Sequence, residues 1–106
     1  RLDRAGLLDA RLALGIYGAG GHTEQLLEGV PELRRVRSFF DSDPTKHGRA
    51  FLGGTVHAPA DIASLQLDAV LISSKAFEEE IMAELKRTLP AAIRVVPLYR
   101  EFGSAS

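Results

Sequence analysis

The chain contains no cysteine, and this absence excludes disulfides, thiolate metal ligands and cysteine nucleophiles. Long apolar runs are also missing. The longest hydrophobic stretches have the length of a strand, so no membrane-spanning segment and no membrane partner are expected. Thirteen Lys and Arg stand against 14 Asp and Glu, which gives a formal net charge of −1 and no sign of a basic face for nucleic acid. These absences favour a cytoplasmic protein whose partner is neither nucleic acid nor a membrane.

The length of 106 residues suits one domain and is too short for the two βαβαβ halves of a complete dinucleotide-binding fold. The first residue is Arg1 rather than Met, and no continuous apolar stretch follows it, so a signal peptide is not expected. We expect residues 1–11 to be a lead-in helix or linker and residues 12–106 to be the folded domain. The domain is expected to come from a larger protein, whose further domains would be its partners.

Apolar runs alternate with helical segments along the chain. The strands are expected near residues 12–17, 36–40, 55–56, 69–73 and 94–98. The third is expected to lie at an edge of the sheet, and residues 45–54 are expected to form a loop. Strands that alternate with helices predict an α/β fold, namely a Rossmann-like three-layer domain with a parallel sheet in the strand order 3-2-1-4-5.

A glycine-rich turn joins the first strand to the first helix. Its residues are Gly18, Ala19, Gly20, Gly21, His22 and Thr23. A phosphate at such a turn meets the unpaired N–H groups and the positive dipole end of the helix. Gly18 would permit the tight turn, and Gly20 would leave out the β-carbon where the ligand approaches most closely. Thr23 stands where the Gly-x-Gly-x-x-Gly pattern has its third glycine, and its hydroxyl would cap the helix or donate to the phosphate.

Further polar residues follow the second and fourth predicted strands. Asp41, followed by Ser42, comes about twenty residues after the turn, where a carboxylate binds ribose hydroxyls in dinucleotide folds and disfavours the 2′-phosphate of NADP. Ser73, Ser74 and Lys75 lie between the fourth strand and the long helix that is expected over residues 76–89. Because ligands bind beyond the carboxyl ends of parallel strands, we expect all of these residues to line one crevice.

Plainer interpretations of the same residues remain open. The glycines would serve turn geometry alone, and Asp41 would cap the turn of its Asp-Ser-Asp-Pro stretch. Ser73 and Ser74 would only begin a helix, Lys75 would be solvated, and His22 would be a half-exposed residue at a helix start. Glu24, in the first helical turn, would repel a phosphate modestly.

The sequence shows no catalytic constellation, so enzyme activity is left undecided. His47 and His57 lack the spacing of metal ligands, and no metal is expected. Neither a Gly-x-Ser-x-Gly elbow nor a pair of acids at hydrolytic spacing is present. Four phenylalanines are expected to pack in the core or to anchor loops: Phe39, Phe40, Phe51 and Phe77.

Three motifs together resemble a known group of modules. They are the glycine turn at 18–23, the stretch Phe40-Asp41-Ser42-Asp43-Pro44 and the strand at 68–73. The chain resembles the Rossmann modules of bacterial polysaccharide-biosynthesis proteins. Among these are the N-terminal domains of PglD-type sugar acetyltransferases and of membrane-associated nucleotide-sugar dehydratases. Similar modules are attached to sugar methyltransferases and glycosyltransferases. The step Gly53-Gly54-Thr55-Val56 after the loop also matches the pattern of these relatives.

The resemblance implies a binding role for this domain. In acetyltransferases of this type, the glycine turn and the first acid of the Asp-x-Asp-Pro stretch serve the nucleotide-sugar, which carries over to Gly18, Gly20, Gly21 and Asp41. Their acetyl-transferring part is a separate left-handed β-helix, and nothing in this chain resembles it. The resemblance therefore implies a module that binds the ligand while a sugar-modifying transferase, methyltransferase or dehydratase domain carries out the reaction.

The sequence thus predicts a domain that binds a UDP-type nucleotide-sugar or NAD, from a protein of surface-polysaccharide or sugar metabolism. One alternative is a fragment of a small NAD-dependent oxidoreductase or epimerase, although a Tyr-x-x-x-Lys pair is missing. Another is a degenerate Rossmann module that serves dimerisation or interdomain packing, which Glu24 and the missing third glycine favour. A homodimer also remains open.

Overall fold

The computed structural model describes residues 6–102 of the chain. Their helices and strands follow one another as β1 (Leu14–Tyr17), α1 (Gly21–Gly29), η1 (Pro31–Arg35), β2 (Ser38–Phe40), η2 (Pro44–Lys46), β3 (Ala50–Phe51), β4 (Gly54–His57), η3 (Pro59–Leu65), β5 (Ala69–Ile72), α2 (Glu78–Thr88), β6 (Arg94–Pro97) and α3 (Leu98–Phe102). The elements labelled η are 3₁₀ helices.

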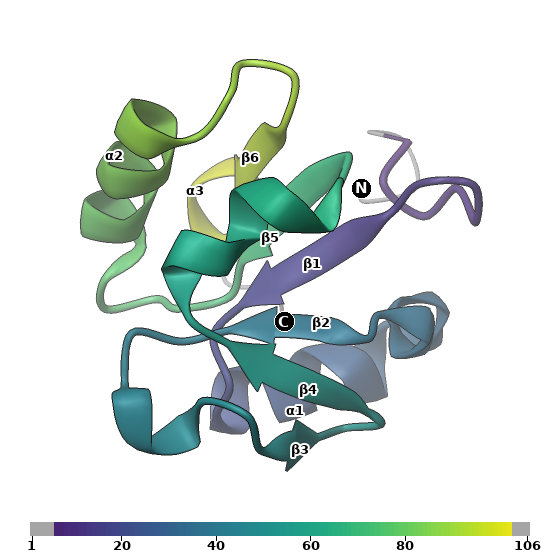
Figure 1. Cartoon of the computed structure of the whole chain (residues 1–106). Helices are drawn as coiled ribbons and strands as arrows, with labels where there is room; N and C mark the ends of the chain where they lie inside the picture. The colour runs from purple at the N-terminus through teal and green to yellow at the C-terminus, as the bar shows by residue number, and fades with distance from the viewer. Residues whose placement is uncertain (1–5, 103–106) are drawn as a thin grey trace.

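The strands of this region form one sheet in the order β3-β4-β2-β1-β5-β6 (Figure 1). β1 pairs in parallel with both β2 and β5, β2 with β4, and β5 with β6. The five strands expected from the sequence therefore lie in the predicted order and in the predicted parallel sense. The prediction of a Rossmann-like α/β fold is confirmed.

One strand was missed. β3 pairs antiparallel with the outer side of β4, so β4 is not the edge strand that its sequence suggested. The two are joined by Leu52 and Gly53, which have φ values of 48° and 84°. A two-residue turn with positive φ at both positions is the tight turn that hairpins favour. Residues 45–54 are consequently not a simple loop, because they contain part of η2 and all of β3.

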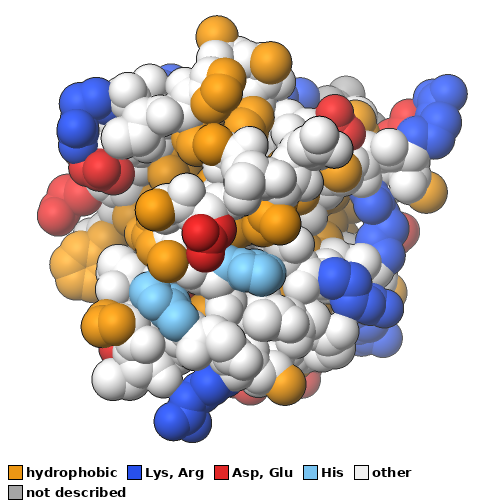
Figure 2. Space-filling model, in the orientation of Figure 1, with side chains coloured by type: hydrophobic (Ala, Val, Ile, Leu, Met, Phe, Trp, Pro, Cys, Tyr) orange, Lys and Arg blue, Asp and Glu red, His pale blue; other side chains and the backbone are white. Residues whose placement is uncertain are grey.

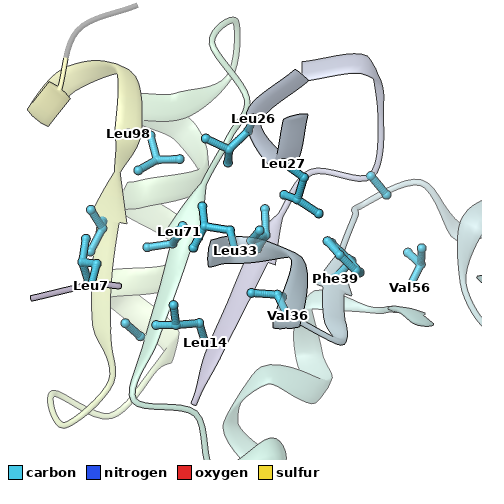
Figure 3. Close-up of a cluster of buried hydrophobic side chains, with 14 residues drawn as sticks. Leu7, Leu14, Leu26, Leu27, Leu33, Val36, Phe39, Val56, Leu71 and Leu98 are labelled. Atoms are coloured by element: carbon cyan, nitrogen blue, oxygen red, sulfur yellow. The ribbon is translucent and has the colours of Figure 1, made fainter. Parts of the chain in front are cut away.

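The side chains of each strand point alternately to the two faces of the sheet, and each face carries its own hydrophobic core. Ile16, Phe39 and Leu71 belong to the first core, which α1 and η1 cover with Leu26, Leu27 and Leu33 (Figure 3). The next residue of each strand, Tyr17, Phe40 and Ile72, belongs to the second core, with Ile62 of η3 and Leu85 of α2. Figure 1 shows α1 behind the sheet and η3 in front of it. This two-sided burial explains why the central strands are continuous apolar runs.

The second long helix follows its sequence pattern. α2 begins with Glu78, Glu79 and Glu80 and ends with Lys86 and Arg87, a charge order that complements the helix dipole. The chain turns directly from β6 into α3, a short helix that the sequence had not suggested.

The described part of the predicted lead-in, residues 6–11, forms turns, and Leu7 is fully buried in the first core. Arg35 holds this segment in place through hydrogen bonds to the carbonyl oxygens of Asp9 and Leu12, both at 2.7 Å. Residues 1–5 of the lead-in lie outside the described residues.

On the face shown in Figure 2, the Lys and Arg side chains lie towards the periphery, and the centre combines hydrophobic and uncharged side chains with an acidic side chain and histidine side chains. Within residues 6–102, the longest apolar helix falls short of what crossing a bilayer requires.

Candidate functional site

A cavity of about 440 Å³ opens beyond the carboxyl ends of β1 and β5. From β1 the chain crosses to β2 on one side, and from β5 it crosses to β6 on the other, so this is the point where the strand order reverses. Every predicted site residue except Lys75 lines the cavity: Gly18, Ala19, Gly20, Gly21, His22, Thr23, Asp41, Ser42, Ser73 and Ser74. The fold therefore brings three separate segments of the sequence to one crevice.

Gly18 and Gly20 have different roles in the turn. Gly18 has a φ of 127°, and a β-carbon added there would lie 2.7 Å from the hydroxyl oxygen of Ser73. Gly18 is therefore required both by its backbone conformation and by space. Gly20 has a φ of −146°, an extended conformation open to any residue, and a β-carbon there would meet nothing within 4 Å. Its lack of a side chain leaves space in the cavity without relieving strain.

Thr23 uses its hydroxyl inside the protein. The side chain is 1% exposed, and its Oγ1 donates to the carbonyl oxygen of Gly18 at 2.6 Å. The same oxygen forms a short hydrogen bond with the hydroxyl of Ser73, which also lies 3.3 Å from the carbonyl of Tyr17. Thr23 thus ties the start of α1 to the ends of β1 and β5, and its hydroxyl does not cap the helix. This contact stands where the glycine pattern has its third glycine.

The first N–H groups of α1 have no hydrogen-bond partner within residues 6–102. The helix begins after Gly20, whose position supplies no side-chain cap. The amides of Thr23 and Glu24 donate to the carbonyl of Gly20, at 3.1 and 3.2 Å. The amides of Gly20, Gly21 and His22 donate no hydrogen bond to any of residues 6–102. Three adjacent donors at a helix start, beside a cavity, form an arrangement suited to an anion.

The loop after β2 holds the turn from the other side. The amide of Ala19 donates to Oδ2 of Asp41 at 3.1 Å, and Nζ of Lys46 donates to the carbonyl oxygen of Ala19 at 3.1 Å. Lys46 also lies 3.6 Å from Oδ2 of Asp41, and the amide of Asp43 donates to Oδ1 of Asp41 at 2.9 Å. Asp41 therefore lines the cavity while both of its oxygens already accept hydrogen bonds from the protein.

Lys46 was not predicted as a site residue. It lies at the end of η2, whose first turn is capped by Asp43 through the amide of Thr45 at 3.0 Å and its hydroxyl at 2.7 Å. These hydrogen bonds lower the pKa of Asp43 below its ordinary value of 3.8. The Asp-x-Asp-Pro motif thus begins a short helix, and this helix places the charged side chain of Lys46 in the lining of the cavity. A lysine two residues after the proline is the sequence signal that would have found it.

The wall opposite the turn comes from α2 and the residues before it. Phe77, Glu80, Ile81 and Glu84 line the cavity at the spacing of one helix face. Phe77 is 58% exposed, so the expectation that it packs in the core or anchors a loop is wrong. The reason is its position just before α2, where it lines the cavity. This wall offers an aromatic ring and two carboxylates.

Tyr17, the last residue of β1, also lines the cavity. Burial and the charge of Asp41 raise the pKa of its hydroxyl, while a hydrogen bond with Ser42 acts in the opposite sense. The hydroxyl therefore stays protonated at neutral pH and can donate or accept a hydrogen bond.

Two charged residues considered in the sequence lie away from the cavity. Lys75 is exposed in the turn before α2 and does not line the cavity, so the structure does not bring it together with the other candidates. Glu24 is exposed on α1 and is also absent from the lining. Because Glu24 is exposed, solvent screens its charge. Among the residues described, no three His, Asp or Glu side chains are grouped as a metal site would require.

Solved structures share this architecture. A UDP-D-quinovosamine 4-dehydrogenase from Vibrio fischeri is 24% identical, with a TM-score of 0.58, and the match covers 83% of this chain and 80% of that one. RSP, a Rex-family repressor, is 16% identical, with a TM-score of 0.55, and the match covers 93% of this chain and 58% of that one. At these identities the likeness shows the Rossmann-like fold.

Comparison with curated protein sequences gives no significant match. A family model does match, over residues 12–93, and it spans both the glycine turn and the Asp41–Lys46 loop. The chain belongs to the family described as C2185-like, N-terminal.

Proposed function

We propose that this domain binds a nucleotide-type ligand, a UDP-type nucleotide-sugar or NAD, with a phosphate at the start of α1. The observation that carries the proposal is the set of three unpartnered amides, those of Gly20, Gly21 and His22, beside the cavity. Backbone donors at a helix start bind phosphate through hydrogen bonds and the helix dipole together. The side chain of Lys46, 40% exposed, adds a cation on the same side of the cavity.

The rest of the cavity suits the other parts of a nucleotide. Asp41 lies where ribose hydroxyls are bound in related folds, and a carboxylate oxygen can accept more than one hydrogen bond. Phe77 contributes an exposed aromatic ring to the lining, and a planar base can stack on such a ring. With Asp41, Glu80 and Glu84 in the lining against Lys46, the cavity favours a ligand whose negative charge is confined to the turn.

The setting in sugar metabolism is part of the proposal. The dehydrogenase of similar fold acts, by its name, on a UDP-linked sugar. The resemblance to PglD-type acetyltransferases and nucleotide-sugar dehydratases supports the same ligand class and a place in the biosynthesis of surface polysaccharides. We propose that the domain works in the cytoplasm beside further domains of its parent chain, and that one of those domains carries out the reaction.

Calorimetric titration of the 106-residue chain with UDP-N-acetylglucosamine, NAD and NADP tests the proposal. We expect UDP-N-acetylglucosamine or NAD to bind more tightly than NADP, because Asp41 repels a 2′-phosphate. Preferential binding of NADP would overturn the role given to Asp41. The absence of binding by all three ligands, in protein that circular dichroism shows to be folded, would overturn the proposed function.

A second candidate function is favoured by the contacts of Asp41. Because both of its oxygens already hold protein groups, the residue would serve structure alone in a module used for dimerisation or interdomain packing. Sedimentation velocity separates the two candidates. A packing module forms a stable dimer or binds its neighbouring domain without any nucleotide, whereas a binding module shows nucleotide affinity as a monomer.

A further inference from the structure

A side chain from the far end of the chain contacts the glycine turn. The hydroxyl of Tyr99, in α3, lies 3.0 Å from Nδ1 of His22, the second residue of α1. The two rings meet edge to face, with centroids 5.9 Å apart and planes at 86°. His22 lines the cavity and Tyr99 does not, so the hydrogen bond holds the ring of His22 from its outer side.

The chemistry of the two groups decides which of them donates. A phenol is a stronger hydrogen-bond donor than a neutral imidazole N–H, and an unprotonated imidazole nitrogen is a stronger acceptor than a phenol oxygen. Burial and the nearby charge of Glu78 raise the pKa of Tyr99, so the phenol keeps its proton. The Tyr99 hydroxyl therefore donates to Nδ1 of His22, and in the neutral ring the proton is left on Nε2.

Tyr99 is itself held in place. Its amide donates to Oε2 of Glu78 at 2.7 Å, and Glu78 is 7% exposed at the start of α2. The carboxylate of Glu78 thus fixes the first turn of α3 against α2, and the position of the Tyr99 ring follows from it.

We propose that Tyr99 is a positioning residue that holds His22 in the Nε2–H tautomer and orients this N–H towards the ligand phosphate. The part of this inference that concerns the ligand rests on the proposed function, whereas the tautomer is a property of the free protein. A donor on Nε2 joins the amides of Gly20, Gly21 and His22 and extends the anion site from backbone to side chain. The neutral ring carries no formal charge, so it adds a donor without adding a second cation that would repel Lys46.

Nitrogen-15 NMR of the histidine rings tests the tautomer in the absence of ligand. The measurement is made at pH 8, where free imidazole is neutral. The signals of His22 are assigned by their loss in His22→Gln. We expect a single Nε2–H tautomer in the wild type and a mixture of both tautomers in Tyr99→Phe, which keeps the ring and removes only the hydroxyl. Ser64→Ala, which removes a hydroxyl bonded to the carbonyl of Asp61 on η3, is the matched control and should leave the His22 signals unchanged.

Titration with inorganic pyrophosphate tests the second part of the inference, the contact between His22 and a phosphate. We expect Tyr99→Phe to bind pyrophosphate about 2- to 10-fold more weakly than the wild type, the range of one neutral hydrogen bond, and Ser64→Ala to bind it equally well. An Nδ1–H tautomer of His22, or a tautomer ratio that Tyr99→Phe does not change, would overturn the positioning role. A changed tautomer ratio with unchanged pyrophosphate affinity would overturn the contact between His22 and phosphate. Failure of the wild type to bind both pyrophosphate and the three nucleotides would instead count against the proposed function.

Discussion

The amide of Ala19 donates to the carboxylate of Asp41 at 3.1 Å, which joins the glycine turn to a loop 22 residues further along the chain. The carbonyl oxygen of Ala19 accepts a hydrogen bond from Lys46, so both backbone polar groups of Ala19 are held by this loop. Asp41 therefore belongs to the construction of the turn as well as to the lining of the cavity.

Replacing this carboxylate should cost stability. In Asp41→Asn an amide NH₂ has to face one of the two backbone N–H groups that Asp41 now accepts from, those of Ala19 and Asp43. We expect the free energy of unfolding in urea to fall by about 1–2 kcal/mol, the cost of one unsatisfied group in a half-buried position. Asp61→Asn, at an exposed position on η3, is the control and should stay within about 0.5 kcal/mol of the wild type. Equal losses in the two variants would show that Asp41 does not hold the turn.

Substitutions at Gly18 and Gly20 should separate stability from binding. Gly18→Ala forces a side chain into a left-handed backbone and against Ser73, so we expect a loss of about 1–3 kcal/mol in unfolding free energy. A β-carbon at Gly20 meets no heavy atom within 4 Å beyond its chain neighbours, so Gly20→Val should change stability by about 0.5 kcal/mol or less. It should nevertheless abolish nucleotide binding by occupying the phosphate position.

Gly29→Ala is the control for both variants. Gly29 is the last residue of α1, and its φ is not positive, so alanine should leave binding intact and stability equal or slightly higher. Unchanged nucleotide affinity in folded Gly20→Val would mean that no phosphate lies at the turn.

Phe77 should matter for nucleotides and not for inorganic anions. Because the ring is 58% exposed, Phe77→Ala should hardly change stability. Loss of one stacking partner is worth about 1–3 kcal/mol, so we expect at least a fivefold loss of nucleotide affinity and no change for pyrophosphate. Leu52→Ala removes the other large exposed hydrophobic side chain among the described residues, away from the cavity, and should leave both affinities unchanged. An equal loss for nucleotide and pyrophosphate would place Phe77 outside the base site.

The capping of η2 should appear as a pH effect. The pKa of Asp43 is lower in the folded chain than its ordinary value of 3.8, so its contribution to stability is complete above that value and is lost as the pH falls through the folded pKa. An NMR titration should place the midpoint of the Asp43 carboxyl below 3.8 in the wild type and closer to 3.8 in Thr45→Val, which keeps the amide donor and loses the hydroxyl. A midpoint at or above 3.8 in the wild type would contradict the cap.

The central strands and α2 could be predicted because each carries a clear pattern in the sequence, an apolar run in the strands and an ordered set of charges in the helix. A run such as Ala69–Ile72 is apolar on both faces, and the Glu-rich start and basic end of α2 mark its direction. β3 could not be predicted, because two residues show no periodicity and the pairing depends on the turn at Leu52. The same limit applies to the site. The ends of the strands predicted where the glycine turn, Asp41 and the serines meet. Tyr99, by contrast, reaches the turn through a tertiary contact that leaves no local pattern in the sequence.

The outer side of β6 has a consequence for how the domain can associate. The amide of Arg94 donates inward to the carbonyl of Asp68, so by the alternation of a strand the amides of residues 95 and 97 point outward. Residue 97 is Pro97, which has no N–H, and Val95 is left as the one outward donor of this strand. At the opposite edge, β3 is only two residues long. Within residues 6–102, both edges therefore offer few of the backbone groups that a further strand would pair with, which disfavours growth of the sheet by edge-to-edge pairing.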